Sequence, residues 1–176
     1  MNKLQDNTFA NTILKVIPII ILFISVFNEF DANYFEIEYL SFNFSYILIF
    51  FCTLKNIDNF GYGLIFFAGI VNDVVSGFPM GISSLCFMLL CVATSYFRSI
   101  TLRPTLMRDW MFFLITISLV NSIKFLILSY VFKSTIDYKY LLVNNFTTFL
   151  LFFFFSFVFN FYYNKFFGKS DVWSKW

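Results

Sequence analysis

The sequence predicts an all-α integral membrane protein, folded as a single bundle of six transmembrane helices. Three observations lead to this fold class. Of the 176 residues, 60% are apolar, aromatic or cysteine and only 12% are charged, whereas about 25% of the residues of a soluble domain are charged. Long apolar runs recur between short polar breaks. The period-two alternation that marks the strands of an outer-membrane barrel is absent from the sequence.

The predicted spans form one membrane domain over residues 1–176, with no linker composition to divide it. Their bounds are 12–27, 39–54, 61–75, 81–97, 110–132 and 141–162, followed by a cytoplasmic tail over 163–176. A helix needs about 20 residues to cross a hydrocarbon core of about 30 Å. The third and fourth spans are therefore close to the lower limit of length.

The first span follows a charged start, as the apolar run of a signal peptide does. No small-x-small cleavage site precedes the acidic segment that begins at Asn28, so we expect a retained first helix. Lys15 can extend to the near interface, and Pro18 is close enough to the helix start to be tolerated. The second span follows the acidic segment and ends at Lys55.

The third and fourth spans are separated by a short break next to a carboxylate. Gly69, Asp73, Gly77 and Gly81 recur every fourth residue, which would place them on one face of a continuous helix. Pro79 excludes a continuous helix, because proline lacks a backbone donor and pushes the preceding residue toward an extended conformation. The glycines beside it tolerate the backbone angles of a tight turn. We therefore expect two helices joined by a very short turn.

The fifth span follows a basic loop. This loop contains Arg98, Arg103 and Arg108, and Trp110 stands at the interfacial depth where the span opens. Topology and attraction to anionic lipid explain the arginines. The alternative is a docking site for a cytoplasmic partner with an acidic face. A short polar turn from Lys133 leads into the sixth span.

The distribution of basic residues predicts that both ends of the chain are cytoplasmic. In this topology the N-terminus, the second and fourth loops and the tail face the cytoplasm. Basic residues inside are Lys3, Lys15, Lys55, Arg98, Arg103, Arg108, Lys165, Lys169 and Lys175, against Lys133 and Lys139 outside. This positive-inside bias places the turn at Pro79 at or just below the outer surface.

Asp73 and Lys124 are charged residues within predicted spans. A carboxylate in an apolar helix is costly unless it is paired, hydrogen-bonded or hydrated. The simplest arrangement packs the third span against the fifth, so that an intramembrane polar cluster forms from Asn72, Asp73, Asn121 and Lys124. Lys124 would have to extend outward along its stem to reach Asp73. The alternatives are contact with a partner helix and a proton or ion relay, although a relay normally contains more ionisable groups.

Small residues around the break allow helix backbones to approach closely. Gly69, Gly77 and Gly81 are the main examples. Tight packing within this chain explains them. The alternative is a surface for another subunit.

The sequence contains few groups suited to catalysis. It has no histidine, the commonest general base and metal ligand. Cys52, Cys86 and Cys91 lie within predicted spans, so we interpret them as buried apolar residues. We find no phosphate-binding loop, nucleophile elbow or zinc helix, and the basic residues follow the membrane rule rather than a nucleic-acid pattern. We expect a protein that is not an enzyme and takes no cofactor, metal, nucleic acid or small-molecule substrate.

The most specific pattern in the sequence surrounds the break. It reads Gly69-x-x-x-Asp73-x-x-Ser76-Gly77-x-Pro79-x-Gly81 and is followed by an apolar helix ending in Tyr96-Phe97-Arg98. This pattern resembles the bacterial rod shape-determining membrane protein family MreD. The resemblance implies that the named residues of the pattern are signature positions and that Arg98 closes the fourth helix. The chain departs from the family where a proline often opens the second helix, since Ser41-Phe42-Asn43-Phe44 stands there.

The resemblance also implies a function. MreD proteins are non-catalytic scaffolds of the elongasome, the cell-wall elongation machinery in the bacterial inner membrane. They pair with the single-span protein MreC, and they link cytoplasmic MreB filaments to RodA and a penicillin-binding transpeptidase. Their fold is similar to the six-helix substrate-binding component of energy-coupling-factor transporters. The expectation is therefore a multi-pass scaffold in the lipid bilayer that takes part in peptidoglycan synthesis and cell shape.

A different functional class is a substrate-capture subunit of a vitamin transporter of the energy-coupling-factor type. Such a subunit needs a ligand-sized cavity that opens outward and has a few convergent polar groups. The candidates for those groups are Asn72, Asp73, Asn121, Asn144 and Asn145. An Ala-x-x-x-Ala coupling face would favour this hypothesis, and the sequence has none.

Overall fold

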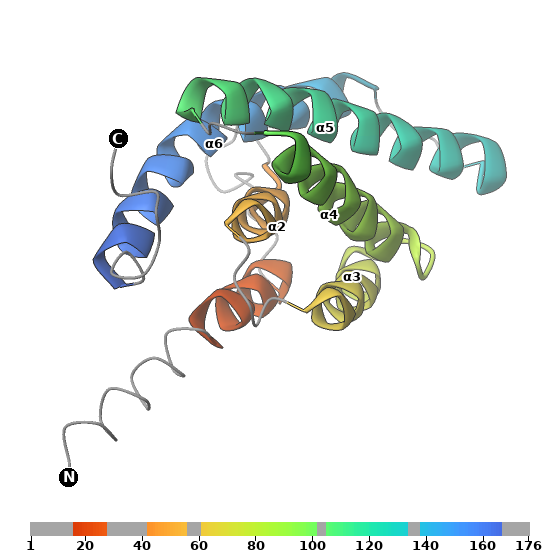
Figure 1. The fold of residues 1–176 in the computed structure, drawn as a ribbon. Helices are drawn as coiled ribbons and strands as arrows, with labels where there is room; N and C mark the ends of the chain where they lie inside the picture. Colours follow the sequence, from red (N-terminus) through yellow and green to blue (C-terminus); the bar gives the residue numbers. More distant parts are fainter. Residues whose placement is uncertain (1–15, 28–41, 56–60, 102–104, 134–137, 167–176) are drawn as a thin grey trace, which may run out of the picture.

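The computed structural model describes residues 16–27, 42–55, 61–101, 105–133 and 138–166 (Figure 1). Within these ranges every regular element is a helix, so the predicted all-α class is confirmed. The elements in chain order are the helix Val16–Phe27, α2 (Phe44–Leu54), α3 (Tyr62–Ser76), α4 (Ile82–Ile100), α5 (Leu106–Leu126), the π-helix η2 (Ile127–Val131) and α6 (Tyr138–Phe166).

Three of the described helices are long and apolar enough to cross a membrane, which identifies the chain as a helical membrane protein. They are Ile82–Ile100, Leu106–Val131 and Leu141–Phe161, and they correspond to the predicted fourth, fifth and sixth spans. The first three predicted spans correspond to shorter apolar helices, which are Val16–Phe27, Phe44–Leu54 and Tyr62–Ser76.

The helix ends agree best with prediction around the break between α3 and α4. α3 begins and ends within one residue of the predicted 61–75, and α4 begins within one residue of position 81. α5 begins at Leu106, before the predicted start at residue 110, and therefore includes Asp109. The predicted start of the first span and the tail from residue 167 lie outside the described residues.

α2 begins later than predicted. Its first helical residue is Phe44 and not residue 39, because Asn43 has a non-helical backbone and stands at the N-cap. The Asn43 carbonyl oxygen accepts the Tyr46 N–H at 3.2 Å, which starts the helix. The predicted residues 39–41 lie outside the described ranges.

α2 lies at the centre of the bundle, with the other helices around it (Figure 1). Every side chain from Ser45 to Cys52 is buried, as expected for a helix that is apolar on all sides. Its 11 residues rise about 16 Å, because an α-helix rises about 1.5 Å per residue. This is roughly half of a hydrocarbon core. The longer helices therefore enclose the described part of α2 (Figure 1).

Aromatic rings join α2 to the two longest helices. The Phe50 ring centroid is 5.0 Å from that of Phe113 on α5 and 5.4 Å from that of Phe152 on α6. Phe113 and Phe152 stack on each other at 4.2 Å. On the other side of α2, the Ser25 and Ser45 hydroxyl oxygens are 2.9 Å apart, which connects the helix Val16–Phe27 to α2. The core therefore holds α2 from two opposite sides.

Candidate functional site

The predicted turn is present as an elbow between α3 and α4, which we define as residues 69–84. Gly77 ends α3 with φ +67°, and Gly81 precedes α4 with φ +101°. Both angles are in the left-handed region, which residues with a Cβ atom rarely adopt. The Phe78 N–H donates to the Asp73 carbonyl oxygen at 3.0 Å, as in a Schellman C-cap. The two glycines therefore end one helix and start the next within a few residues.

Ser76 and Pro79 complete the turn. Ser76 is the last residue of α3. The Pro79 carbonyl oxygen accepts the Ile82 N–H at 3.4 Å. A proline in this place leaves no N–H group unpaired and prevents α3 from continuing. The expectation of two helices joined by a short turn is confirmed.

Asp73 is fully buried, and its carboxylate caps the N-terminus of α4. The Gly81 N–H donates to Oδ2 at 2.7 Å, and the Ser83 N–H donates to Oδ1 at 2.8 Å. The first N–H groups of a helix have no partner within that helix, and the helix N-terminus carries a partial positive charge. Hydrogen bonds to a charged group contribute about 1.5–3 kcal/mol each. Backbone groups of the next helix therefore stabilise this buried carboxylate.

Gly69 allows α3 and α4 to touch through their backbones. A Cβ atom at Gly69 would overlap the Ser84 Cα atom and lie 2.6 Å from the Ser84 nitrogen. Next to this contact, the Ser84 hydroxyl donates to the Phe66 carbonyl oxygen at 3.0 Å. Close packing within the chain, the first of the two explanations for this glycine, is therefore what the structure contains.

The hydrogen bonds of the predicted intramembrane polar cluster are made in two places, at the start of α4 and on α6. The Asn72 side chain donates to the Ser83 hydroxyl at 2.9 Å and so joins Asp73 at the start of α4. The Asn121 side chain donates instead to Asn145 Oδ1 on α6 at 3.3 Å. The physical reason is that the turn itself presents unpaired backbone N–H groups to Asp73, so the carboxylate is satisfied on α4.

Lys124 reaches the elbow but contacts an aromatic ring there. Its Nζ atom is 4.2 Å from the centroid of the Phe78 ring, within the range of about 6 Å for a cation–π interaction. This contact joins Lys124 to the residue between Gly77 and Pro79, and the pairing of Lys124 with Asp73 stays a prediction. Phe78 is a site residue that sequence reasoning missed, although its position in the turn marks it.

Two adjacent asparagines tie α6 to α2 and α5. Asn144 Oδ1 accepts a hydrogen bond of 2.7 Å from the Asn43 side chain, and the Asn43 N–H donates to the Thr148 hydroxyl at 3.0 Å. The Asn145 side chain donates to the Ser118 hydroxyl of α5 at 3.1 Å. These residues were candidates for lining a ligand cavity, and in the structure they make hydrogen bonds within the chain.

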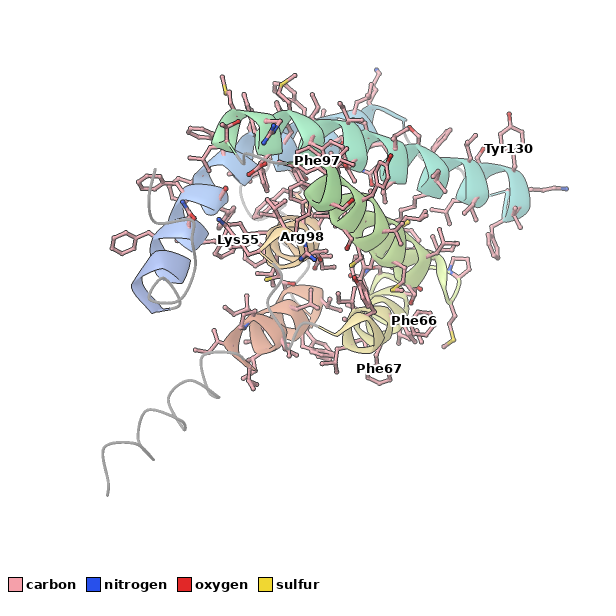
Figure 2. The ribbon with its side chains drawn as sticks, in the orientation of Figure 1. Lys55, Phe66, Phe67, Phe97, Arg98 and Tyr130 are labelled. Carbon is pink, nitrogen blue, oxygen red and sulfur yellow. The ribbon has the colours of Figure 1, made fainter. Side chains whose placement is uncertain are left out.

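The opposite end of α4 carries the basic loop. Arg98 Nη1 donates to the Thr53 carbonyl oxygen in the last turn of α2 at 3.2 Å, and Figure 2 shows Arg98 and Lys55 at the same end of α2. A cation stabilises the partial negative charge of a helix C-terminus. Arg108 is exposed in the first turn of α5, and Arg103 lies outside the described residues. Arg98 therefore has a structural role that the sequence did not predict.

Asp109 is a second buried carboxylate, and it precedes the predicted fifth span. It lies in the first turn of α5, and only 8% of its surface is exposed. Its Oδ1 atom has no hydrogen-bond partner in the part of the chain that the structure describes. Burial lowers the pKa of Lys55, and the charge of Asp109 opposes this shift. The signal that marks Asp109 is Thr105, an N-cap residue type placed one turn earlier.

The described residues contain no group of three or more His, Cys, Asp or Glu side chains that could hold a metal ion. The free cysteines Cys52, Cys86 and Cys91 are buried, as expected. Comparison of the chain with protein-family models, with curated proteins and with solved structures found no match. Function is therefore inferred from the elbow and from the pattern of residues that forms it.

Proposed function

We propose that the chain is a non-catalytic scaffold subunit of the bacterial rod complex, acting in peptidoglycan synthesis and cell shape. In this proposal it crosses the inner membrane six times with both ends in the cytoplasm. It binds the single-span protein MreC, and it links MreB filaments to RodA and a penicillin-binding transpeptidase. The observation that carries the proposal is the elbow, where the residues that resemble the MreD signature hold α3 and α4 together.

Four of the six signature positions have a physical role here that supports this proposal. Gly69 permits the contact with Ser84, Asp73 binds the first N–H groups of α4, and Gly77 and Gly81 supply left-handed backbone. The elbow is therefore preorganised, so a partner that binds the elbow does not have to order it. This property suits a protein that holds others in place.

The outward side of α3 offers a surface for a partner helix. Phe66 and Phe67 are 48% and 56% exposed and lie at the periphery of the bundle in Figure 2. Leu64 and Val74 on the same helix are also exposed. Helices associate in membranes mainly through van der Waals packing. A single transmembrane helix, as in MreC, fits this surface.

The ends of α4 are consistent with the proposed orientation. The elbow precedes α4, while Arg98 stands in its last turn. Lys55 lies at the same end of α2 as Arg98 (Figure 2), and Arg108 follows at the start of α5. Basic residues at one end favour a cytoplasmic location for that end. To test this topology, Met80→Cys should react with an impermeant thiol reagent from the periplasm and Ser99→Cys only after the cells are opened.

Hydrogen bonding within the chain favours the scaffold over the substrate-capture alternative. Asp73 and Asn72 bind the start of α4, Asn121 and Asn145 bind each other, and Asn144 binds Asn43. A polar group that is engaged in this way must lose a hydrogen bond before it can bind a ligand. Capture of a vitamin would therefore require rearrangement of the bundle.

The decisive experiment is depletion of the chain in the bacterium that encodes it. We expect the cells to become round and the tagged chain, extracted in mild detergent, to co-purify with MreC. A gene carrying Gly69→Leu should fail to restore the rod shape, while Gly63→Leu on the same helix should restore it, because nothing lies within 4 Å of a Cβ atom at Gly63. Depleted cells that remain rod-shaped, or a purified chain that carries a bound vitamin, would overturn the proposal.

A further inference from the structure

α3 is too short to cross the hydrocarbon core of a typical bilayer. Both of its ends lie within the described residues, since Gly61 before it is extended and Gly77 after it is left-handed. Its 15 residues rise about 22 Å at about 1.5 Å per residue, whereas the hydrocarbon core is about 30 Å thick. Any tilt of the helix would lower its height across the membrane further.

α4 runs back beside α3 and has nearly the same apolar height. Arg98 in its last turn lies about 24 Å along the helix axis from Ile82, the first residue of α4. At the same end, the Tyr62 hydroxyl of α3 and the Ser95 hydroxyl of α4 are 3.3 Å apart, and this contact is exposed. The two helices therefore begin and end at the same two levels, with the turn of the elbow at one level and polar side chains at the other.

Neither end of this helix pair can sink into the hydrocarbon. In the turn of the elbow, Gly77 and Met80 are exposed, Met80 to 76%. Non-helical backbone that is exposed to lipid does not occur within the hydrocarbon, because its unpaired polar groups are costly there. At the other end, the first N–H groups of α3 have no partner within the helix, Gly61 supplies no side-chain cap, and Arg98 is charged and exposed. Both ends therefore need water or lipid headgroups.

The surface between these two ends is apolar and faces outward. α3 lies at the edge of the bundle in Figure 1. Exposed apolar side chains on α3 and α4 include Phe66, Phe67, Val74, Val75, Leu85 and Val92. Elsewhere in the bundle, Leu106–Val131 has 26 residues and Leu141–Phe161 has 21, which rise about 39 Å and about 32 Å. Those two helices are long enough for the hydrocarbon core, so they do not share the shortfall of α3 and α4.

We propose that the surface formed by α3 and α4 thins the bilayer beside it and fits phospholipids with shorter acyl chains than those around α5 and α6. The hydrocarbon core exceeds the height of this surface by about 6–8 Å. A bilayer accommodates a short apolar stretch by thinning next to it, at a modest free-energy cost. Lipids with shorter chains reduce that cost, so they gather at this surface. The inference concerns the chain in lipid and does not depend on the complex in which the chain acts.

The first test measures depth in dioleoyl phosphatidylcholine vesicles that contain the full chain. A single spin label is placed at Met80→Cys in the elbow or at Tyr96→Cys near the other end of α4, both sites being exposed and the native cysteines buried. Collision rates with oxygen and with a water-soluble nickel complex give the depth of each label.

Both labels should lie at the level of the lipid headgroups. A label at Leu119→Cys, an exposed site near the middle of the apolar helix Leu106–Val131, is the control and should lie in the hydrocarbon. A label at Met80→Cys or Tyr96→Cys that lies at hydrocarbon depth would overturn the proposal, because the helix pair would then sink into a bilayer of normal thickness.

A second test compares the lipids next to two matched sites. A fluorophore is attached at Phe67→Cys on α3 or at Phe153→Cys on α6, because both native side chains are 56% exposed and both lie near the middle of their apolar helices. The vesicles contain equal amounts of short-chain dimyristoleoyl and long-chain dierucoyl phosphatidylcholine, and one of the two lipids is brominated so that it quenches fluorescence.

With the short-chain lipid brominated, quenching should be roughly twofold stronger at the α3 site than at the α6 site. Brominating the long-chain lipid instead should reverse the order. Equal quenching at the two sites would overturn the proposal. Dipolar coupling between spin labels at Phe67→Cys on different chains would also overturn it, because a second copy of the chain would then cover α3 in place of thinned bilayer.

Discussion

Two buried carboxylates at opposite ends of the bundle have different surroundings. Asp73 in the elbow accepts two backbone N–H groups from α4. Asp109 at the other end is nearly as buried, and its Oδ1 atom has no partner in the described structure. Both lie close to a helix N-terminus. The difference is that Asp73 approaches α4 from another helix and faces unpaired donors, whereas Asp109 belongs to α5, and its own N–H is already bonded to the Thr105 carbonyl oxygen.

This difference indicates how each end of the bundle contributes to stability. The elbow combines satisfied polar groups with backbone contact, which is the condition for a stable and unique geometry. The other end combines a carboxylate with one unpartnered oxygen, among the described residues, and an exposed Arg108. Polar groups that reduce stability are common at functional sites, where a protein binds a partner or a ligand. Substitutions in the elbow should therefore destabilise the chain strongly, and substitutions at the other end should do so weakly or even stabilise it.

The largest effect is expected for Asp73→Leu. This change leaves the Gly81 and Ser83 N–H groups without acceptors in an apolar interior, which costs roughly 3–5 kcal/mol of unfolding free energy. Asp73→Asn retains one acceptor oxygen and should lose about half as much. Thermal unfolding of the purified chain in detergent measures both. If Asp73→Leu unfolds at the temperature of the unsubstituted chain, the carboxylate does not stabilise the elbow.

Gly69→Ala should have the next largest effect. The added Cβ atom meets the Ser84 backbone, so α3 and α4 must separate, at a cost of about 1–3 kcal/mol. Gly63→Ala is the matched control on the same helix, because nothing lies within 4 Å of its new Cβ atom. That control should gain about 0.5–1 kcal/mol from improved helix propensity. The same thermal measurement should therefore show opposite signs for the two glycines, and equal signs would contradict the close contact.

The elbow was the part of the chain most open to prediction from sequence. Gly77, Pro79 and Gly81 act through local backbone geometry, so their effect on α3 and α4 is visible in the sequence itself. The partner of Asp73 was not predictable, because the donors become available only when the turn folds back. The contact of the Lys124 ammonium group with the Phe78 ring was not predictable for the same reason, because the turn must form before Phe78 faces α5.

Other features depended on contacts between distant residues. The start of α2 depends on Asn43, its N-cap residue. Asn43 binds Asn144 and Thr148, which are more than a hundred residues away along the chain. The interfacial preference of Trp110 predicts that the fifth span starts at residue 110, which leaves Asp109 outside the span. The N-cap position of Thr105 gives the correct start. At the start of α5, the N-cap residue type therefore locates the helix end better than hydropathy does.

Asp109→Leu should increase stability. It removes a buried oxygen that has no donor among the described residues, although it also removes the attraction to Lys55 and Arg108, so the net gain is less than about 1 kcal/mol. Under the proposed function, the same variant should be tested for rescue of cell shape. A more stable protein that fails to restore the rod shape would assign Asp109 to partner contact. A loss of stability would instead mean that the attraction of Asp109 to Lys55 and Arg108 outweighs the penalty of its unpartnered Oδ1 atom.

Arg98→Met should have the smallest measurable effect, less than about 1 kcal/mol. The guanidinium group is exposed and makes one bond to the Thr53 carbonyl oxygen at the end of α2, and exposed charges at helix ends contribute about 0.3–1 kcal/mol. Arg108→Met is the control, since Arg108 is also exposed and should change stability by less than about 0.5 kcal/mol. High salt should reduce the difference between these two variants, because it screens an exposed cation. It should leave the Asp73→Leu loss almost unchanged, because the bonds of Asp73 are buried. A salt-dependent Asp73 effect would mean that water reaches the elbow and that both ends of the bundle are held together by surface electrostatics.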